Sequence, residues 1–176
     1  MSIGNTLSEI QGRDEPNDIF YTPSSLARDL IMFVDIEANQ SILDPFKGKG
    51  AFYDNYPVEN EKDWFEIQEG RDFFEIKQSY DWMISNPPFS KTNEIIEKSC
   101  MYSKVGFAYL WPTYTLSYSR LKKIESFGFY LDTMIYFENP KEWKIGFQMA
   151  FFIFTKKRSN SIKLIEECDA IQQRLF

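Results

Sequence analysis

The sequence predicts an α/β fold with a mainly parallel central sheet and a C-terminal antiparallel hairpin. Two observations lead to this prediction. Short apolar segments alternate with helical segments along most of the chain, which is typical of a parallel sheet. Near the end, two apolar segments follow one another without a helix between them, so we expect them to pair as a hairpin. Of the 176 residues, 43% are hydrophobic and 18% aromatic, which is enough apolar surface for a folded core.

The chain shows no internal repeat and no low-complexity linker. We expect residues 1–18 to be a flexible N-terminal segment and residues 19–176 to form a single domain. The polar start has no apolar segment typical of a signal peptide, and the longest apolar runs are too short to span a bilayer. We therefore expect a cytoplasmic protein that does not contact a membrane.

The first expected element is a helix within residues 21–34. Thr22 is suited to the N-cap and Pro23 to the first helical position, and an apolar stripe follows. Residues 41–57 then predict a short strand, a glycine turn and a short helix. Another strand is expected at residues 63–67, with a turn at residues 69–76.

The next strand, at residues 80–84, must end at Pro87 and Pro88, because proline cannot donate to a sheet ladder. A later helix, expected at residues 116–127, should be closed by Gly128 at its C′ position. The elements expected here are a helix at about 91–103, a strand at 105–111, a helix at 116–127, strands at 129–137 and 146–156 joined by 138–145, and a short polar helix at the end.

The composition excludes several chemistries. Without any histidine, neither a Ser-His-Asp nor a Cys-His centre can form, and no zinc site with histidine ligands is possible. The two cysteines, Cys100 and Cys168, lack a metal-type spacing and are expected to be buried, reduced thiols, so we expect no metal. The net charge of −6 requires that any nucleic acid be bound through a local basic face.

A glycine turn follows the first expected strand. Asp44 ends that strand, and Gly48 and Gly50 would let the backbone adopt positive φ and approach a ligand closely. The segment lacks the ending of a phosphate-binding P-loop, and an acid at the strand end suits a cationic ligand better than a pyrophosphate. The alternative interpretation is a plain connection between a strand and a helix.

Two further acidic positions are candidates for ligand binding. Glu66 ends the neighbouring strand at a distance from Asp44 that suits hydrogen bonds to the two hydroxyls of a ribose. Asp72 could accept a hydrogen bond from an adenine amine while Phe73 packs on the ring. The alternatives are a surface glutamate for the first, and a capping residue beside a core phenylalanine for the second pair.

The run Ser85 to Ser90, "SNPPFS", is the most informative segment. The Asn86 side chain and the Pro87 backbone each offer a carbonyl acceptor at one strand end, where two acceptors could hold both hydrogens of a planar amino group. Phe89 could then stack on the ring that carries the amine. Taken by itself, the run could also be only a turn.

Together these segments resemble a known family. Asp44-Pro45-Phe46 with Gly48 and Gly50, followed by the tetrapeptide Asn86-Pro87-Pro88-Phe89, is similar to the S-adenosylmethionine-dependent amino-methyltransferases, in particular the DNA adenine-N6 methyltransferases. Tyr21-Thr22-Pro23 resembles the N-terminal cofactor motif of that family. The resemblance covers residues 20–155 and implies a Rossmann-like class I methyltransferase fold.

The resemblance also implies roles for these residues and a function. The cofactor would be S-adenosylmethionine, and the product a methyl group on the N6 amine of adenine in DNA. The tetrapeptide would hold the flipped-out base. The residues expected to bind the cofactor are Tyr21, Thr22, Pro23, Asp44, Pro45, Phe46, Gly48, Gly50, Glu66, Asp72 and Phe73.

Substrate contacts are expected near the tetrapeptide and in the hairpin loop. Lys91 follows the tetrapeptide, and Trp143 is flanked by Lys141 and Lys144, a combination typical of nucleic-acid contact, although an ordinary exposed loop is the alternative. The chain shows no evident target-recognition domain. We therefore expect nucleic acid as the partner, with a separate specificity subunit or a second copy of the chain as further candidates. RNA adenine or protein glutamine as substrate, or a non-catalytic binding subunit, remain alternative functions.

Overall fold

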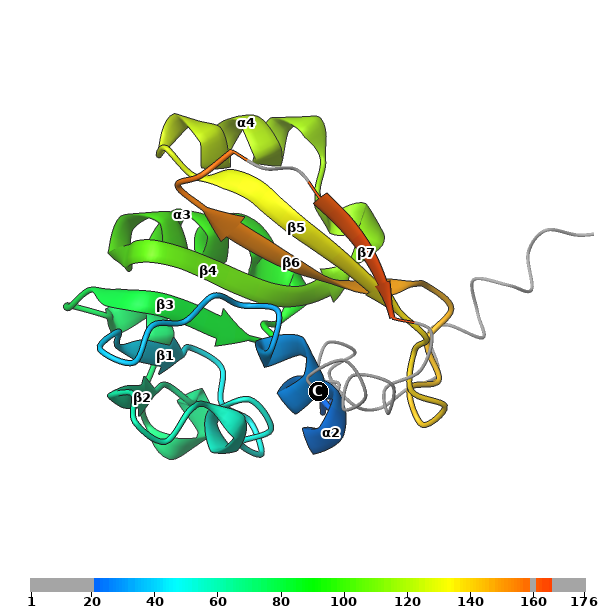
Figure 1. Ribbon diagram of the computed structural model, residues 1–176, viewed down its shortest axis with the longest axis horizontal. Helices are drawn as coiled ribbons and strands as arrows, with labels where there is room; N and C mark the ends of the chain where they lie inside the picture. The colour runs from blue at the N-terminus through cyan, green and yellow to red at the C-terminus, as the bar shows by residue number, and fades with distance from the viewer. Residues whose placement is uncertain (1–20, 159–160, 166–176) are drawn as a thin grey trace, which may run out of the picture.

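A computed structural model describes residues 21–158 and 161–165 of the chain (Figure 1). The expected flexible segment, residues 1–18, lies outside the described residues, as does Cys168. The expected α/β architecture is confirmed. One seven-stranded sheet runs through the molecule in the order β2-β1-β3-β4-β6-β5-β7. Its strands are β1 (Ile42–Asp44), β2 (Lys62–Trp64), β3 (Tyr80–Ser85), β4 (Ser103–Pro112), β5 (Tyr130–Phe137), β6 (Met149–Thr155) and β7 (Ser161–Ile165).

The sheet is parallel except at one strand. β1 pairs in parallel with both β2 and β3, and β3 pairs in parallel with β4. β6 runs antiparallel to β4 and β5, so the expected hairpin of β5 and β6 is confirmed. The register Leu110↔Phe151 places long apolar strands against each other at the centre of the sheet.

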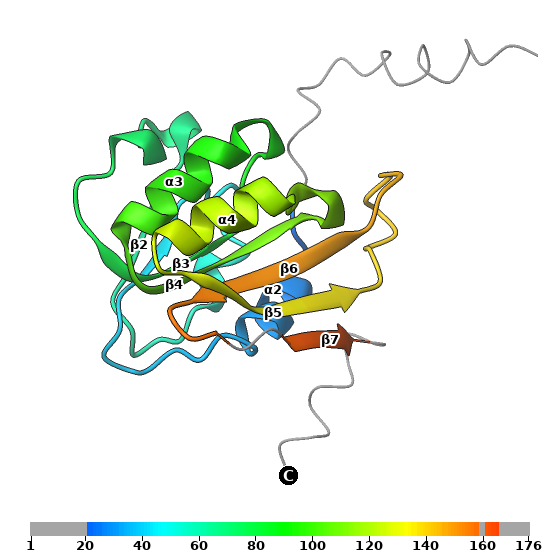
Figure 2. The ribbon, with the colours of Figure 1, turned by 90° about the horizontal axis from the view of Figure 1, so that it is seen from above.

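Helices cover both faces of the sheet. α2 (Ser24–Ile31) lies on one face, and α3 (Thr92–Tyr102) and α4 (Tyr118–Ser126) lie on the other (Figure 2). Because successive strand side chains point to opposite faces, β3 contributes to two separate cores. Trp82 and Ile84 pack in the α2 core, and Met83 packs in the core under α3 and α4.

One expected boundary and one expected element differ from the structure. Thr22 is not the N-cap of α2. That position belongs to Pro23, whose ψ of 138° is extended rather than helical, so the helix begins one residue later than expected. The polar helix expected after the hairpin is replaced over Ser161–Ile165 by β7, which pairs in parallel with β5, and residues 166–176 lie outside the described part. The segment forms a strand because it pairs with β5 at the edge of the sheet, since its own sequence does not strongly favour either a strand or a helix.

Of two further expectations, one is confirmed and the other is met only by a shorter element. Gly128 has φ +81° directly after α4, as expected for a C′ residue. The helix expected after the glycine turn is a single 3-10 turn, Tyr53–Asn55.

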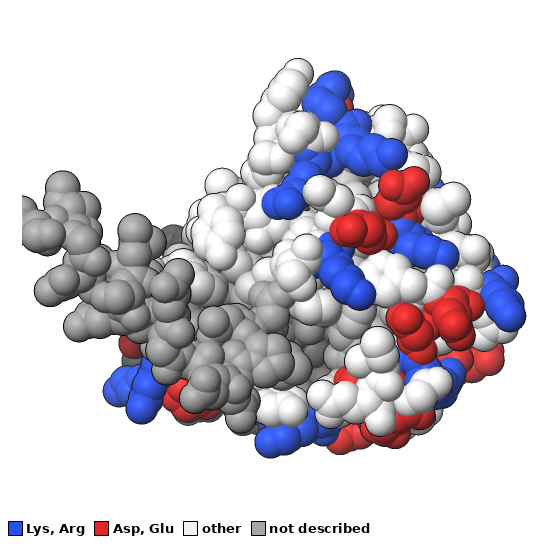
Figure 3. Space-filling view, turned by 180° about the vertical axis from the view of Figure 1, so that it is seen from behind, with Lys and Arg blue, Asp and Glu red and all other residues white. Residues whose placement is uncertain are grey.

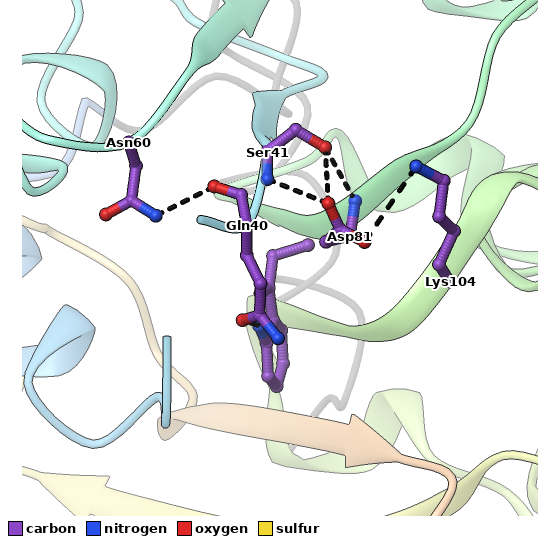
Figure 4. Close-up of polar contacts among 6 residues, drawn as sticks. Gln40, Ser41, Asn60, Asp81 and Lys104 are labelled. Atoms are coloured by element: carbon purple, nitrogen blue, oxygen red, sulfur yellow. Dashed lines mark hydrogen bonds and ion pairs between the residues drawn. The ribbon is translucent and has the colours of Figure 1, made fainter. Parts of the chain in front are cut away.

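A polar network joins the amino ends of β1, β3 and β4 (Figure 4). The backbone amide and hydroxyl of Ser41 both donate to Oδ2 of Asp81, at 2.8 and 2.7 Å, and Lys104 lies 3.8 Å from the other carboxylate oxygen. Nearby, the amide of Asn60 donates to the backbone carbonyl of Gln40. Although burial alone would raise the pKa of Asp81, the bonds from Ser41 and the charge of Lys104 lower it. The network holds β1, β3 and β4 in register and leaves their carboxyl ends to build a site.

The order of the strands indicates where that site lies. β1 is flanked by β2 on one side and by β3 on the other, so the chain runs from β1 outward to β2 and then crosses back past β1 to β3. In open α/β sheets, ligands bind beyond the carboxyl ends of the strands at such a point. Among the described residues, no helix is long and apolar enough to cross a membrane.

Candidate cofactor and amine site

Gly48 and Gly50 give the turn after β1 its backbone conformation. Gly48 and Gly50 have φ of +50° and +85°, as the sequence predicts. A Cβ atom at Gly50 would lie 2.9 Å from Oδ2 of Asp54, and one at Gly48 would touch the ring of Tyr21. Only the Gly50 position is thus too tight for a Cβ atom, and Gly48 is exposed and lines the pocket.

Asp44 is buried at the base of this turn. The side chain is 1% exposed; its Oδ1 accepts hydrogen bonds from the Ser85 hydroxyl at 2.6 Å and the Phe46 amide at 3.2 Å. Its Oδ2 atom is buried and has no hydrogen-bond partner among the described residues, although the Tyr53 amide is near enough to favour the charged form. Burial is the dominant effect and raises the pKa of Asp44 to about 7. The buried carboxyl therefore braces the start of the glycine turn from inside the fold, through Ser85 and the Phe46 amide.

Glu66 lies opposite the glycine turn. Its Oε2 atom accepts a hydrogen bond from the Gly48 amide at 2.7 Å, and its Oε1 atom accepts one from the Gln68 amide at 3.1 Å. An ionised carboxylate can accept about four hydrogen bonds, so two acceptor positions remain for a ligand. The bond to Gly48 joins the ends of β1 and β2 into one wall.

Asn86 follows β3 and is held by the N-terminal segment. Its side-chain amide donates to the Thr22 hydroxyl at 3.3 Å, and the two residues are 64 positions apart in the sequence. Next to it, Ser85 also donates to the Phe46 carbonyl at 3.2 Å. Ser85 therefore ties the tetrapeptide to the glycine turn, and Thr22 orients Asn86. Neither link was predicted from the sequence.

These elements enclose one pocket with a volume of about 430 Å³. This is within the range of roughly 300 to 1,000 Å³ that is typical of small-molecule sites. The glycine turn and Glu66 line it on one side, and Asn86 and Pro88 line it on the other. The full lining comprises Tyr21, Thr22, Phe46, Lys47, Gly48, Lys49, Ala51, Phe52, Glu66, Ile67, Gln68, Asn86 and Pro88.

The two lysines of the glycine turn are held by neighbouring side chains. Lys47 forms an ion pair with Glu69 at 3.0 Å and lies 3.9 Å over the Trp64 ring. Lys49 lies 4.1 Å over the Tyr21 ring. Both cations are therefore partly compensated, which reduces their repulsion toward a positively charged ligand in the pocket.

Trp143 corrects the expectation of an exposed, substrate-binding loop. The side chain is only 6% exposed; it packs against Phe137, and its indole nitrogen donates to the Tyr21 backbone carbonyl at 2.9 Å. Trp143 thus anchors the segment that carries Tyr21 and Thr22 and has no ring face available for a substrate. Lys141 and Lys144, on either side, are exposed.

Asp72 and Phe73 take the structural roles that the sequence left as alternatives. Asp72 caps the 3-10 helix Phe73–Glu75 by accepting from the Phe74 amide at 2.9 Å. Phe73 is 2% exposed and packs edge-on against Phe46, so its ring cannot also lie on an adenine in this structure. Neither residue lines the pocket. Ile67, which is 67% exposed and does line it, offers the apolar surface on that side instead.

The remaining expected residues are not among those that line the pocket. Pro45 and Pro87 are buried, and Phe89 begins the 3-10 helix Phe89–Lys91 and is partly buried. Lys91 lies 4.9 Å over the Phe74 ring. Cys100 is buried away from the site, and burial raises the pKa of its thiol to about 12. Within the described residues, no three His, Cys, Asp or Glu side chains form a group that could hold a metal ion.

The sheet order, the site at the β1 switch point and the antiparallel β6 can be compared with known folds. The chain has the class I methyltransferase fold. A Listeria monocytogenes protein provisionally classed as a class I S-adenosylmethionine-dependent methyltransferase superimposes with a TM-score of 0.64 and 15% identity, over 94% of this chain and 72% of that one. No family model and no curated protein matches the sequence.

Two further solved structures share the fold. A modification subunit assigned to a type I restriction enzyme of Vibrio vulnificus YJ016 matches with a TM-score of 0.61 and 15% identity, over 93% of this chain and 50% of the subunit. A Pyrococcus horikoshii protein classed provisionally as an RNA methyltransferase matches with a TM-score of 0.61 and 18% identity, over 78% of this chain and 86% of that one. This chain therefore spans half the length of the Vibrio subunit.

Proposed function

We propose that the protein is an S-adenosylmethionine-dependent methyltransferase that acts on the N6 amine of adenine in DNA. One observation carries the proposal: Asn86 and Pro88 line the same pocket as the glycine turn and Glu66. A cofactor in this pocket and an amine held by the tetrapeptide would therefore be neighbours. The solved proteins of this fold include type I modification subunits and one protein named as an RNA methyltransferase, which agrees with a nucleic-acid substrate.

The residues present fit S-adenosylmethionine. The glycine turn would let the cofactor lie against the backbone, and Glu66 would accept hydrogen bonds from the ribose hydroxyls. Asp44 does not line the pocket; it would act on the cofactor only indirectly, by holding the glycine turn in shape through its bonds with the Ser85 hydroxyl and the Phe46 amide. When bound, the cofactor supplies an electrophilic methyl group on a sulfonium.

The tetrapeptide would supply positioning and electrostatic stabilisation. The carbonyl oxygens of Asn86 and Pro87 would accept the two hydrogens of the amine and draw its lone pair out of conjugation with the ring. Positive charge grows on this nitrogen during transfer, and fixed carbonyl dipoles stabilise it. Holding nitrogen, methyl and sulfur in line is an effect of orientation and needs neither histidine nor a metal. Phe89 would stack on the extruded base.

The substitution Asn86→Ala tests this assignment. We expect it to lower labelled-methyl transfer to DNA by about a hundredfold or more, since a preorganised dipole aimed at developing charge is removed. Affinity for S-adenosylmethionine, measured by calorimetry, should change by no more than about twofold, because the glycine turn and Glu66 are intact. Asn39→Ala, at an exposed position before β1, serves as the control and should behave as wild type.

Other results would redirect the proposal. If Asn86→Ala transferred methyl groups at the wild-type rate, the tetrapeptide would not hold the amine. If the wild type bound the cofactor and labelled RNA or protein but not DNA, the fold and chemistry would stand and the DNA substrate would be wrong. No detectable cofactor binding at millimolar concentration would instead favour a non-catalytic binding subunit.

A further inference from the structure

An aromatic ridge leads from the tetrapeptide to the surface. It consists of Phe89, Phe147 and Tyr114, which come from three different connections of the chain. The rings of Phe89 and Phe147 have centroids 6.3 Å apart, and those of Phe147 and Tyr114 are 5.6 Å apart, both edge to face. Phe89 and Phe147 are partly buried, whereas Tyr114 is 66% exposed. The exposed end of the ridge thus lies two ring contacts from the tetrapeptide.

The outer ring is presented by a fixed support. Tyr114 belongs to the 3-10 helix Thr113–Thr115, which directly follows β4. The Thr113 amide donates to the Gln148 carbonyl at 2.9 Å, which joins this helix to the hairpin that carries Phe147. On its other side, Arg120 donates to the Thr115 carbonyl at 2.6 Å and to the Asn93 side chain at 2.8 Å.

The position of the ridge follows from the sheet. Parallel strands β3 and β4 end at the same edge, and the connection between β5 and β6 returns to that edge (Figure 1). Phe89 follows β3, Tyr114 follows β4, and Phe147 precedes β6. The three rings therefore meet because of the topology, and sequence spacing gives no indication of it.

We propose that Tyr114 stacks on a nucleotide next to the target base, and that the substrate strand is unpaired at the site. This inference rests on the proposed function. A flat, exposed ring continuous with a site for a flipped base matches the stacking platforms that bind single strands through the π-face of any base. In a paired duplex, the neighbouring base would be stacked on its own neighbours and would not be available to Tyr114.

Charge around the ridge is low: Lys91 lies on the 3-10 helix of Phe89, Arg120 lies beside the support of Tyr114, and the charges of the hairpin cancel. In the hairpin that carries Phe147, the exposed Lys141 and Lys144 are accompanied by the exposed Glu138 and Glu142. Few phosphates would be neutralised by such a surface, so stacking should supply most of the local affinity. The dependence of binding on salt should accordingly be shallow.

The test measures binding of a fluorescein-labelled single-stranded deoxyoligonucleotide with one adenine, by anisotropy, to the full chain. Tyr114→Ala should weaken binding about fivefold or more, in line with the loss of one stacked base. Tyr114→Trp should bind at least as tightly as wild type. Tyr118→Ala, which removes a tyrosine that is 79% exposed on α4 and outside the ridge, should change nothing.

A duplex with the same sequence should bind more weakly than the single strand, and S-adenosylmethionine affinity should be the same in all variants. If Tyr114→Ala bound the single strand as tightly as Tyr118→Ala, or if the duplex bound more tightly than the single strand, the inference would be wrong while the proposed function stood. A wild type that bound the cofactor but neither oligonucleotide would overturn both the ridge and the nucleic-acid substrate.

Discussion

At the scale of single residues, Asp44 is a buried acid whose pKa depends on the fold. The sequence places an acid at the end of a strand, but only the structure shows that the carboxyl is buried and bonded to Ser85. Burial raises the pKa of Asp44 to about 7, so in the folded protein the protonated form predominates below about pH 7. An ordinary aspartate in the unfolded chain titrates near 3.8.

This difference predicts a pH-dependent contribution to stability. Between about pH 4 and pH 7 the unfolded chain has lost the Asp44 proton while the folded chain keeps it, so this contribution to the free energy of unfolding falls as pH rises. It is full below pH 4 and lost above about pH 7. Asp44→Asn, which cannot ionise, should remove the fall.

Urea unfolding at several pH values checks the prediction. The difference in the free energy of unfolding between wild type and Asp44→Asn should shift in favour of the variant from pH 4 to pH 7 and then remain constant. Asp35→Asn, at an exposed position after α2, is the control. A difference that stays the same at every pH would show that Asp44 is ionised in the folded protein.

At the scale of elements, the strands that carry the site were predictable, and the contacts among their connections were not. The strand ends at Asp44 and Asn86 follow from local signals, a glycine turn and two prolines. The burial of Trp143 is invisible in a polar loop, because its partner Tyr21 is 122 positions away. The strand β7 likewise depends on pairing with β5 and not on its own sequence.

β4 shows how tightly the central elements are packed. At Gly106 the strand passes between its neighbours, and a Cβ atom there would lie 2.5 Å from the Phe154 carbonyl oxygen and 2.5 Å from the Trp82 ring. Backbone on one side and a buried ring on the other leave little room for adjustment.

Gly106→Ala should therefore destabilise the protein strongly, by about 3 kcal/mol or more, since overpacking of this core forces the strands apart. Gly146→Ala, at a position where a Cβ atom meets nothing within 4 Å, is the matched control and should change stability by less than about 1 kcal/mol. Thermal unfolding of both variants gives the comparison. Equal melting temperatures would mean that β4 can move away from Trp82 at little cost.

At the scale of the whole molecule, the pocket, the tetrapeptide and the aromatic ridge all lie at the carboxyl ends of the parallel strands. The sheet face covered by α3 and α4 carries Lys and Arg side chains that gather at the top of the view and are mixed with Asp and Glu below (Figure 3). Ion pairs such as Lys122–Glu125 and Lys123–Glu97 compensate charge there. Under the proposed function, nucleic acid would be recognised at the carboxyl ends of the strands, where the pocket and the tetrapeptide lie.

The measurement that tests the central claim most directly identifies the methylated product. The protein is incubated with S-adenosylmethionine carrying a labelled methyl group and with single-stranded and duplex DNA, and the DNA is digested to nucleosides. We predict that the label appears in N6-methyladenine, and that the single-stranded DNA incorporates more of it than the duplex. Label in another nucleoside, or none in DNA while the cofactor binds, would contradict the assignment of the tetrapeptide to the N6 amine of adenine.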